Sequence, residues 1–187
     1  MHQLLGGHSI HILLARGIEL LTKNSEVWVV DDDVSIRWVL EHVRHRIEAE
    51  FKGNIEIQRD YDPSIPEATG HKEYLIQAIL NVARNAAQAV DGRGDIQFRT
   101  RVRRQFTVGQ RRYRHVLEAS IRDAGPGIPL ELQGKIFLPM ITDRPNGTGL
   151  GLALAREMVS REGGAIECTS CPGDTRFTFF LPVVSNS

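Results

Sequence analysis

The stretch "GTGLGLALAREMV" at residues 147–159 places three glycines within five positions, directly before a helical pattern. Glycine lets the backbone approach a ligand closely, and a helix N-terminus offers free N–H groups and a positive dipole end. The combination predicts a phosphate site, although a helix-entry turn alone would also use such glycines. No Lys-Ser or Lys-Thr follows as in a P-loop, and "LPMITDRPN" (138–146) does not supply the strand that a dinucleotide fingerprint needs.

Composition and charge exclude several classes of protein. The 187 residues suffice for one domain of ordinary size, with or without an appendage. Lys+Arg and Asp+Glu both number 23, so no overall charge favours nucleic acid or an anionic membrane. The basic run "RTRVRRQFTVGQRRYRH" (99–115) is interpreted as a solvated hairpin, because stacking aromatics are not regularly interleaved. We therefore expect no nucleic-acid partner and no membrane partner.

The two cysteines, Cys168 and Cys171, form a lone CxxC. A zinc site needs a second ligand pair and a thioredoxin-like site needs a βαβ setting, whereas this pair lies in a strand–turn–strand pattern. We interpret them as incidental thiols. No apolar run approaches the roughly 18 residues that span a bilayer, and no signal-peptide pattern precedes the domain. These features predict a reducing, cytoplasmic location.

Apolar periodicity divides the first half of the chain into alternating elements. A short helix is expected within residues 10–21, followed by a β-branched run that ends in three acids at 27–33. Helical spacing covers 34–51, with apolar residues at Ile36, Val39, Leu40, Val43 and Ile47. A strand is predicted at 54–62, a proline-containing loop at 62–70 and a long amphipathic helix at 71–90.

The second half is predicted to be mostly antiparallel. Strands are expected at 94–104 and 112–123, joined by a loop at 105–111. A glycine turn, a long loop and the helix at 151–159 follow, and a hairpin at 165–182 ends the pattern. This order predicts an α+β fold, a two-layer α/β sandwich whose mixed, mostly antiparallel sheet carries helices on one face.

Two asparagines on the long predicted helix are candidate ligands. Asn81 and Asn85 are four residues apart and so share one face. Asn85 lies within a turn of Val82 and Ala89 on the apolar stripe, which argues against a purely solvent-facing position. Amide oxygens are hard donors suited to Mg²⁺, which bridges to substrate phosphates.

Asp123 ends a predicted strand and enters "AGPGI". A carboxylate there can accept a hydrogen bond from an amino group while the backbone turns beneath a flat ring. Alone it is equally a turn residue. Together with the asparagine pair upstream and the glycines downstream, it favours a nucleotide site.

The order Asn-x-x-x-Asn-Ala, Asp-x-Gly-x-Gly-Ile, Phe, Gly-Thr-Gly-Leu-Gly-Leu resembles the Bergerat-type ATP-binding fold of gyrase, MutL repair proteins, heat-shock chaperones and sensor histidine kinases. "RDYDPSIPE" (59–67), "LNVARNAAQAV" (80–90) and "PGDTRFTFFLP" (172–182) more particularly resemble the catalytic domain of nitrogen-regulation sensor histidine kinases. The resemblance covers roughly residues 41–183.

The resemblance implies roles for particular residues. Asn81 and Asn85 would be catalytic, with Asn85 ligating Mg²⁺. Asp123 would bind the adenine amino group. Gly147, Gly149 and Gly151 would form a phosphate lid, and Phe137 would anchor its mobile loop. The full set implied to bind ATP is Asp123, Gly125, Gly127, Phe137, Gly147, Thr148, Gly149, Leu150 and Gly151. The family usually has Asn after the adenine-binding Asp; Ala124 stands there instead, which predicts weaker nucleotide binding or a less well positioned Mg²⁺.

The implied activity is phosphoryl transfer from ATP-Mg²⁺ to a histidine. An amide at Asn81 cannot act as a general base, so direct hydrolysis by an activated water should be poor. None of the seven histidines lies in the family's phosphoacceptor motif, so the acceptor is expected in trans, on a histidine-containing dimerisation domain that serves a cognate response regulator. The alternative is a non-catalytic nucleotide-binding or regulator-interaction module.

The N-terminal part differs in character. "HQLLGG" (2–7) resembles the end of a dimerisation hairpin, and "EVWVVDDDVSIRWVLE" (26–41) resembles the first strand and helix entry of a response regulator. We therefore predict an irregular segment at 1–40 and the ATP-binding catalytic domain at 41–187. Asp31, Asp32 and Asp33 are interpreted as an inactive relic or engineered graft, or as a solvated acidic loop.

Overall fold

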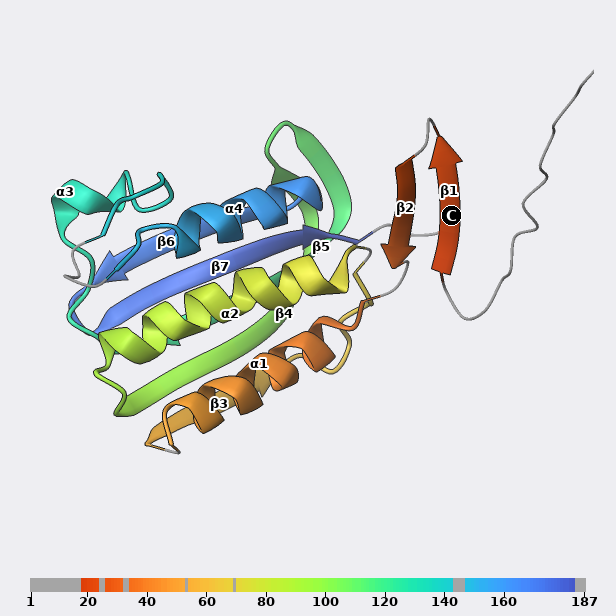
Figure 1. The fold of residues 1–187 in the computed structure, drawn as a ribbon. Helices are drawn as coiled ribbons and strands as arrows, with labels where there is room; N and C mark the ends of the chain where they lie inside the picture. The colour runs from red at the N-terminus through yellow and green to blue at the C-terminus, as the bar shows by residue number, and fades with distance from the viewer. Residues whose placement is uncertain are drawn as a thin grey trace, which may run out of the picture.

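The computed structural model describes residues 18–23, 26–31, 34–52, 54–68, 70–142 and 147–183 (Figure 1). The first two ranges form a two-stranded antiparallel sheet of their own. The elements in chain order are β1 (Ile18–Lys23), β2 (Glu26–Asp31), α1 (Ile36–Glu50), β3 (Ile55–Tyr61), α2 (Lys72–Ala89), β4 (Gly94–Val108), β5 (Arg111–Asp123), α3 (Leu130–Gln133), α4 (Gly151–Arg161), β6 (Ala165–Cys171) and β7 (Asp174–Pro182).

A five-stranded mixed sheet in the order β3-β4-β5-β7-β6 forms one layer. β3 runs parallel to β4, whereas the other neighbours are antiparallel. Helices α1, α2 and α4 cover one face of this sheet (Figure 1). The predicted fold class, a two-layer α+β sandwich with a mixed sheet, is confirmed. No helix of the described ranges is both long enough and apolar enough to cross a membrane.

α1 follows from its apolar spacing. Ser35 precedes the helix, and its hydroxyl accepts a hydrogen bond from the Trp38 N–H at 3.4 Å. All five apolar positions named from the sequence are buried: Ile36, Val39, Leu40, Val43 and Ile47. The predicted boundary between residues 40 and 41 falls inside this helix, so the packed body includes residues N-terminal to it. The assignment of 1–40 to a separate segment stays a prediction.

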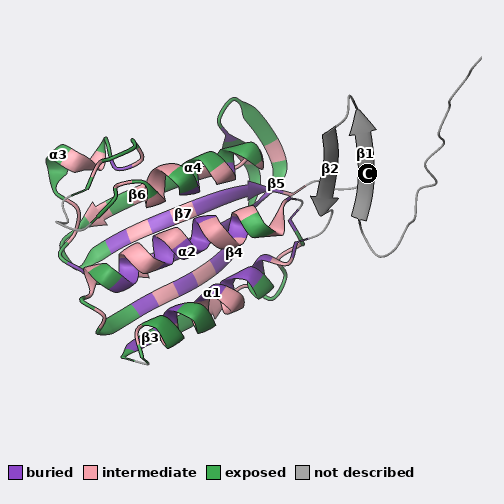
Figure 2. Ribbon diagram, viewed as in Figure 1, coloured by how far each residue is buried: buried purple, intermediate pink, exposed green. Residues whose placement is uncertain are grey.

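α2 is the central helix of the layer and packs against both α1 and α4. Figure 2 shows α2 as mainly buried and half-buried residues, with more exposed residues on α1. Phe98 on β4 and Phe179 on β7 are fully buried beneath these helices. Burying such side chains is the main stabilising contribution to the layer. α2 is therefore held firmly in the layer, and the side chains that it presents to the site have fixed positions.

The β4–β5 connection differs from the prediction. A loop was expected at 105–111, but the two strands continue to a two-residue turn at Gly109 and Gln110. Gly109 has φ +61°, the left-handed conformation that a tight hairpin turn requires. The strands extend because Phe106 stacks on Phe180 at 4.8 Å between ring centroids, in a small apolar cluster outside the main core.

The helix expected within residues 10–21 is wrong for its described part. Residues 18–21 belong to β1, where Ile18 pairs with Asp31 and Leu21 with Trp28. An adjacent extended partner supplies backbone hydrogen bonds that outweigh weak local helix propensity. The β-branched run lies in β2 as far as Asp31. Residues 10–17, Asp32 and Asp33 lie outside the described residues.

Candidate nucleotide-binding site

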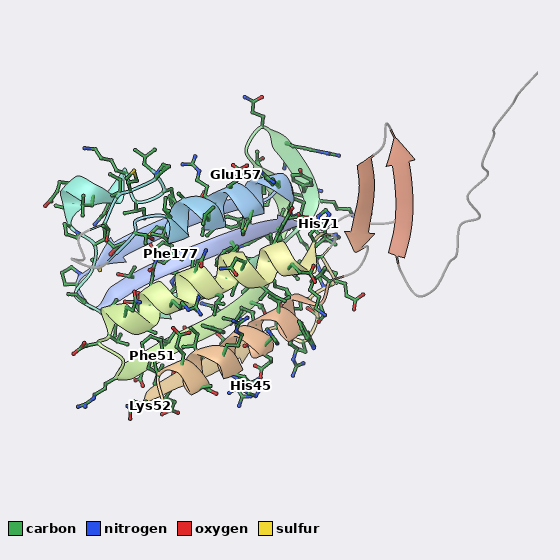
Figure 3. All side chains as sticks on the ribbon, in the orientation of Figure 1. His45, Phe51, Lys52, His71, Glu157 and Phe177 are labelled. Atoms are coloured by element: carbon green, nitrogen blue, oxygen red, sulfur yellow. The ribbon has the colours of Figure 1, made fainter. Side chains whose placement is uncertain are left out.

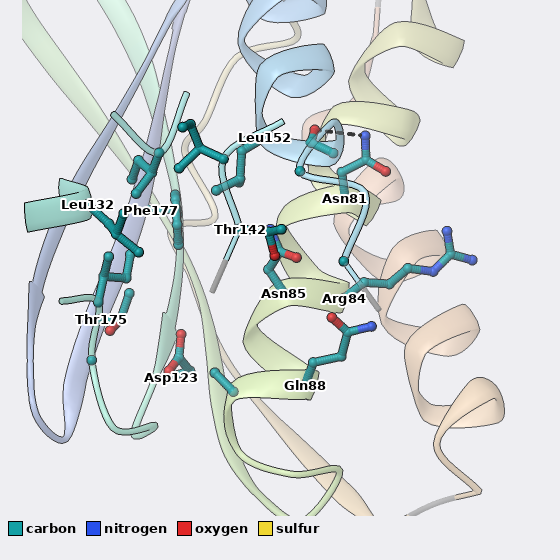
Figure 4. Close-up of a pocket in the computed structure, with 18 of the residues that line it drawn as sticks. Asn81, Arg84, Asn85, Gln88, Asp123, Leu132, Thr142, Leu152, Thr175 and Phe177 are labelled. Carbon is teal, nitrogen blue, oxygen red and sulfur yellow. Dashed lines mark hydrogen bonds between the residues drawn. The ribbon is translucent and has the colours of Figure 1, made fainter. Parts of the chain in front are cut away.

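A cleft of about 460 Å³ lies between α2, the end of β5, the loop that leads to α3, and the segment before α4 (Figure 4). Eight of the predicted ATP-binding or catalytic residues line it: Asn81, Asn85, Asp123, Gly127, Gly147, Thr148, Gly149 and Gly151. Gly125, Phe137 and Leu150 do not line it but flank it in the chain. The fold thus brings together segments that lie up to 70 residues apart and that were predicted to form one site. The roles of the individual residues stay predictions.

One wall is the polar face of α2. Asn81, Arg84, Asn85 and Gln88 follow each other at helical spacing along the cleft (Figure 4). Asn85 is half-buried, as its position beside the apolar stripe predicts. A carboxamide held at that depth on a rigid helix is a suitable oxygen donor for a hard cation.

Asn81 connects α2 to the start of α4. Its Nδ2 donates to the Gly151 carbonyl at 3.1 Å, and its Oδ1 accepts from Gln77 Nε2 at 3.0 Å. A backbone carbonyl can only accept, so the chemistry fixes the orientation of the Asn81 amide and makes Gln77 the donor on its other side. Both ends of the Asn81 amide therefore have protein partners.

The other end of α4 is also joined to α2. Glu162, just after α4, accepts a hydrogen bond from the His71 N–H at 3.0 Å and contacts His71 Nδ1 at 3.0 Å. Its side chain is only 8% exposed. Figure 3 shows His71 at the beginning of α2, where a carboxylate complements the helix dipole. α4 is thus fixed at both ends to the same helix.

Below the α2 wall, residues 124–129 and the β6–β7 turn form a surface that we call the floor. Asp123 is 2% exposed, and its Oδ1 accepts the Gly125 N–H at 2.9 Å. The Gly173 N–H donates to the Gly125 carbonyl at 2.8 Å, which ties the loop to the turn. The predicted adenine-binding carboxylate therefore sits at a buried, hydrogen-bonded strand end.

Further hydrogen bonds hold the floor from β6. Ser170 Oγ accepts the Ile128 N–H at 2.8 Å and contacts Thr175 Oγ1 at 2.8 Å. Gln133 on α3 donates to the carbonyls of Ile128 and Ser170, at 2.8 and 3.2 Å. Sequence reasoning missed Ser170 and Gln133, because their partners come from another strand and no local pattern marks them.

The floor glycines are required by close packing. Gly127 has φ +87°, and a Cβ there would lie 2.9 Å from the Cys171 carbonyl carbon. A Cβ on Gly125 would lie 2.9 Å from Cβ of Ala89. Each glycine thus lets the loop approach another backbone or α2, which is compatible with a flat ring lying above it.

Above the cleft, residues 138–142 and 147–150 form a segment that we call the roof. Gly149 has φ +66°, its carbonyl accepts the Met140 N–H at 3.0 Å, and a Cβ there would lie 2.5 Å from Met140 backbone. Met140 is 79% exposed and Leu138 is 49% exposed. Gly149 was predicted to leave room for phosphate; its immediate steric requirement is instead contact with the roof's own backbone.

Phe137 lies at the root of the roof. Its ring meets Phe177 edge-on, 6.3 Å between centroids at 88°, and the Arg156 guanidinium lies 5.8 Å from its centre. This packing on the core fixes one end of the roof. At the other end, Leu150 stands at the N-cap of α4 without a side-chain hydrogen bond, and its N–H donates to Thr148 Oγ1 at 3.4 Å. The α4 N-terminus opens on the cleft through Gly151 and Leu152.

Two electrostatic features of the site stand out. Among the described residues that line the cleft, Arg84 is the only lysine or arginine. Burial, together with the negative charge of Asp123, raises the pKa of the Cys168 thiol to about 12. Cys168 and Cys171 are free thiols three residues apart on β6, so they point to opposite faces of the strand.

An asparagine-bearing helix opposite a buried aspartate, with a glycine segment leading to an open helix N-terminus, defines a nucleotide-binding α+β domain. The chain belongs to the family of histidine kinase-, DNA gyrase B- and HSP90-like ATPases, which it matches at residues 70–185. The resemblance drawn from the sequence motifs is therefore confirmed.

Curated relatives narrow the similarity. The chain is 43% identical over 150 residues to the sensory histidine kinase/phosphatase NtrB of Salmonella typhimurium, and 40% identical over 156 residues to NtrB of Rhodobacter capsulatus. Each alignment covers 80% of this chain, which spans 43% of the relative's length.

Solved structures share the fold. The mycobacterial sensor histidine kinase MprB superposes with a TM-score of 0.66 at 27% identity, covering 81% of this chain and 96% of that one. The catalytic domain of histidine kinase ThkA gives a TM-score of 0.68 at 24% identity, covering 80% and 93%. The five-stranded sheet with its covering helices is thus the fold of histidine kinase catalytic domains.

Proposed function

We propose that the chain binds ATP with Mg²⁺ and transfers the γ-phosphoryl group to a histidine supplied in trans, within a two-component nitrogen-regulation system in the cytoplasm. The observation that carries the proposal is the single cleft that unites Asn81 and Asn85 with Asp123 and the glycine segment before α4. Similarity to NtrB supports the acceptor class and a response regulator as the final partner.

The base and the phosphates would occupy opposite ends of the cleft. Asp123, with the floor glycines beneath, would accept the adenine amino group. The roof and the N-terminus of α4 would face the phosphates, because uncapped N–H groups and the helix dipole favour anions there. The tied floor gives the base a preformed surface, which limits the ordering that binding requires.

The donor set fits Mg²⁺ bound mainly through nucleotide. No group of three or more His, Cys, Asp or Glu that could hold a metal occurs in the part of the chain that the structure describes. Asn85 would contribute one amide oxygen, and phosphates and waters the others. When bound, Mg²⁺ would neutralise charge that develops on the transferred phosphoryl group.

Transfer to a side chain suits the site better than hydrolysis. Asn81 occupies the wall position one turn before Asn85, and an amide cannot take a proton from water. Its hydrogen bond to Gly151 would instead position the α4 N-terminus against the phosphates. Asn81 therefore acts by orientation in this proposal, and Asn85 by metal binding.

The test is incubation of the chain with labelled ATP, Mg²⁺ and an isolated dimerisation hairpin from an NtrB relative. Acid-labile label should appear on the hairpin histidine, and Asn85→Ala should abolish it. ATP binding without phosphohistidine would instead support a non-catalytic nucleotide-binding module, the alternative that the exposed Ala124 favours because it offers no amide to the nucleotide.

A further inference from the structure

Arg84 lies on the wall of the cleft that α2 forms. It is the only lysine or arginine among the described residues that line the cleft, and it stands between Asn81 and Asn85 in the sequence of α2. The cleft also contains the carboxylate of Asp123. A polyphosphate entering there needs more positive charge than a helix dipole provides, and Arg84 is the side chain placed to supply it.

The present partner of Arg84 is Glu50, the last residue of α1. Arg84 Nε lies 3.1 and 2.9 Å from the two Glu50 oxygens. The two side chains are 36% and 39% exposed, so the pair is accessible to water and weakly held. Figure 4 shows the Arg84 side chain leaving α2 on the side away from Asp123, at the edge of the cleft.

We propose that Arg84 exchanges Glu50 for the phosphates of the bound nucleotide, and that Glu50 competes with the nucleotide for this guanidinium. The planar guanidinium can form two parallel hydrogen bonds to a phosphate, and the higher charge of phosphate makes it a stronger partner than an exposed carboxylate. This inference rests on the proposed function, because it assumes that phosphates enter the cleft.

The exchange predicts opposite effects for the two partners. Removing the guanidinium weakens every ligand that carries phosphates but leaves a phosphate-free ligand unaffected. Removing the Glu50 charge releases Arg84 and strengthens phosphate-bearing ligands. If Arg84 served only to tie α2 to α1, both substitutions would act alike, through stability.

The experiment compares calorimetric affinities of a non-hydrolysable ATP analogue with those of adenosine, in the presence of Mg²⁺. Arg84→Gln should weaken the analogue about ten-fold, the scale of one charged hydrogen-bonded contact, and change adenosine by less than about two-fold. Glu50→Gln should tighten the analogue by about two- to five-fold and should have no effect when Arg84→Gln is already present. Arg46→Gln, an exposed arginine on α1 outside the cleft, is the matched control for lost charge.

The outcomes separate this inference from the proposed function. If the unsubstituted chain binds neither analogue nor adenosine, the proposed function is wrong. If it binds the analogue and Arg84→Gln binds it equally well, or loses adenosine to the same extent, the role of Arg84 is overturned. Unfolding midpoints recorded for all variants show whether a folding defect contributes.

Discussion

The floor and the roof border the same cleft and both depend on glycine, yet they are held differently. In the floor, Ser170, Gln133 and Gly173 tie residues 124–129 to β6 and the β6–β7 turn, and the adjoining carboxylate of Asp123 is buried. The roof exposes most of Met140 and half of Leu138. Extensive hydrogen bonding gives high local stability and exposed apolar side chains give little. The floor is therefore suited to a rigid base, and the roof to a ligand that brings its own charge and metal.

The largest effect is expected from a substitution in the floor, which tests whether the floor is the more stable of the two regions. Gly127→Val would force an unfavourable φ and drive a branched side chain into backbone at Cys171. We expect the free energy of unfolding to fall by about 2–5 kcal/mol, with loss of nucleotide binding. Urea denaturation measures the change. Gly134→Ala, with open space around its Cβ, is the control and should be near neutral; a Gly127→Val chain as stable as that control would show that the floor is not rigid.

The equivalent change in the roof should act on binding and leave the fold intact. Gly149→Val would collide with Met140 backbone and lose the left-handed φ. We expect affinity for a non-hydrolysable ATP analogue to fall about 10- to 100-fold, measured by calorimetry, while the core keeps its unfolding transition.

Hydrogen exchange across residues 138–152 is a second test of whether the roof binds the nucleotide. Saturating analogue should slow exchange there in the unsubstituted chain and not in Gly149→Val. Exchange that is equal with and without ligand in the unsubstituted chain would mean that these glycines serve only a turn.

The asparagine pair offers a smaller, more selective test. Asn81→Ala removes the hydrogen bonds to Gln77 and Gly151, so we expect about 1–2 kcal/mol less stability. Asn85→Ala should cost less stability, because Ala is a good helix former, but should remove most of the Mg²⁺ dependence of ATP binding. Thermal unfolding and titrations with and without Mg²⁺ separate the two; the reverse pattern would exchange their roles.

The last prediction concerns the reactivity of the two thiols on β6 and needs no substitution. With its pKa raised to about 12, Cys168 stays a protonated thiol until the pH approaches that value, and only the thiolate reacts. We expect a thiol reagent at pH 8 to modify exposed Cys171 at least about 100-fold faster than Cys168, as followed by peptide mass spectrometry. Comparable rates would indicate that β6 opens readily beneath the floor.

The sequence predicted what depends on local periodicity or on spaced motifs. The buried stripe of α1 and the meeting of Asn85 with Asp123 follow from such patterns. It did not predict contacts between distant segments that no motif in the sequence marks. The β4–β5 strands extend because Phe106 finds Phe180, and Asn81 bonds to Gly151, 70 residues away. Arg84 was missed because only the full lining of the cleft shows that no other described lysine or arginine lies there.

The double attachment of α4 to α2 has a mechanical consequence. The helix is 11 residues long, so its attachments to Asn81 and His71 lie about 16 Å apart. Because both of its ends are held, α4 should move little relative to α2. Displacing α4 would break the contacts of both Asn81 and Glu162, so a movement of the roof should displace the segment before Gly151 more than α4 itself. A change of bound nucleotide should therefore alter the conformation of the outer surface at Leu138 and Met140. It should leave the far end of α4 almost unchanged.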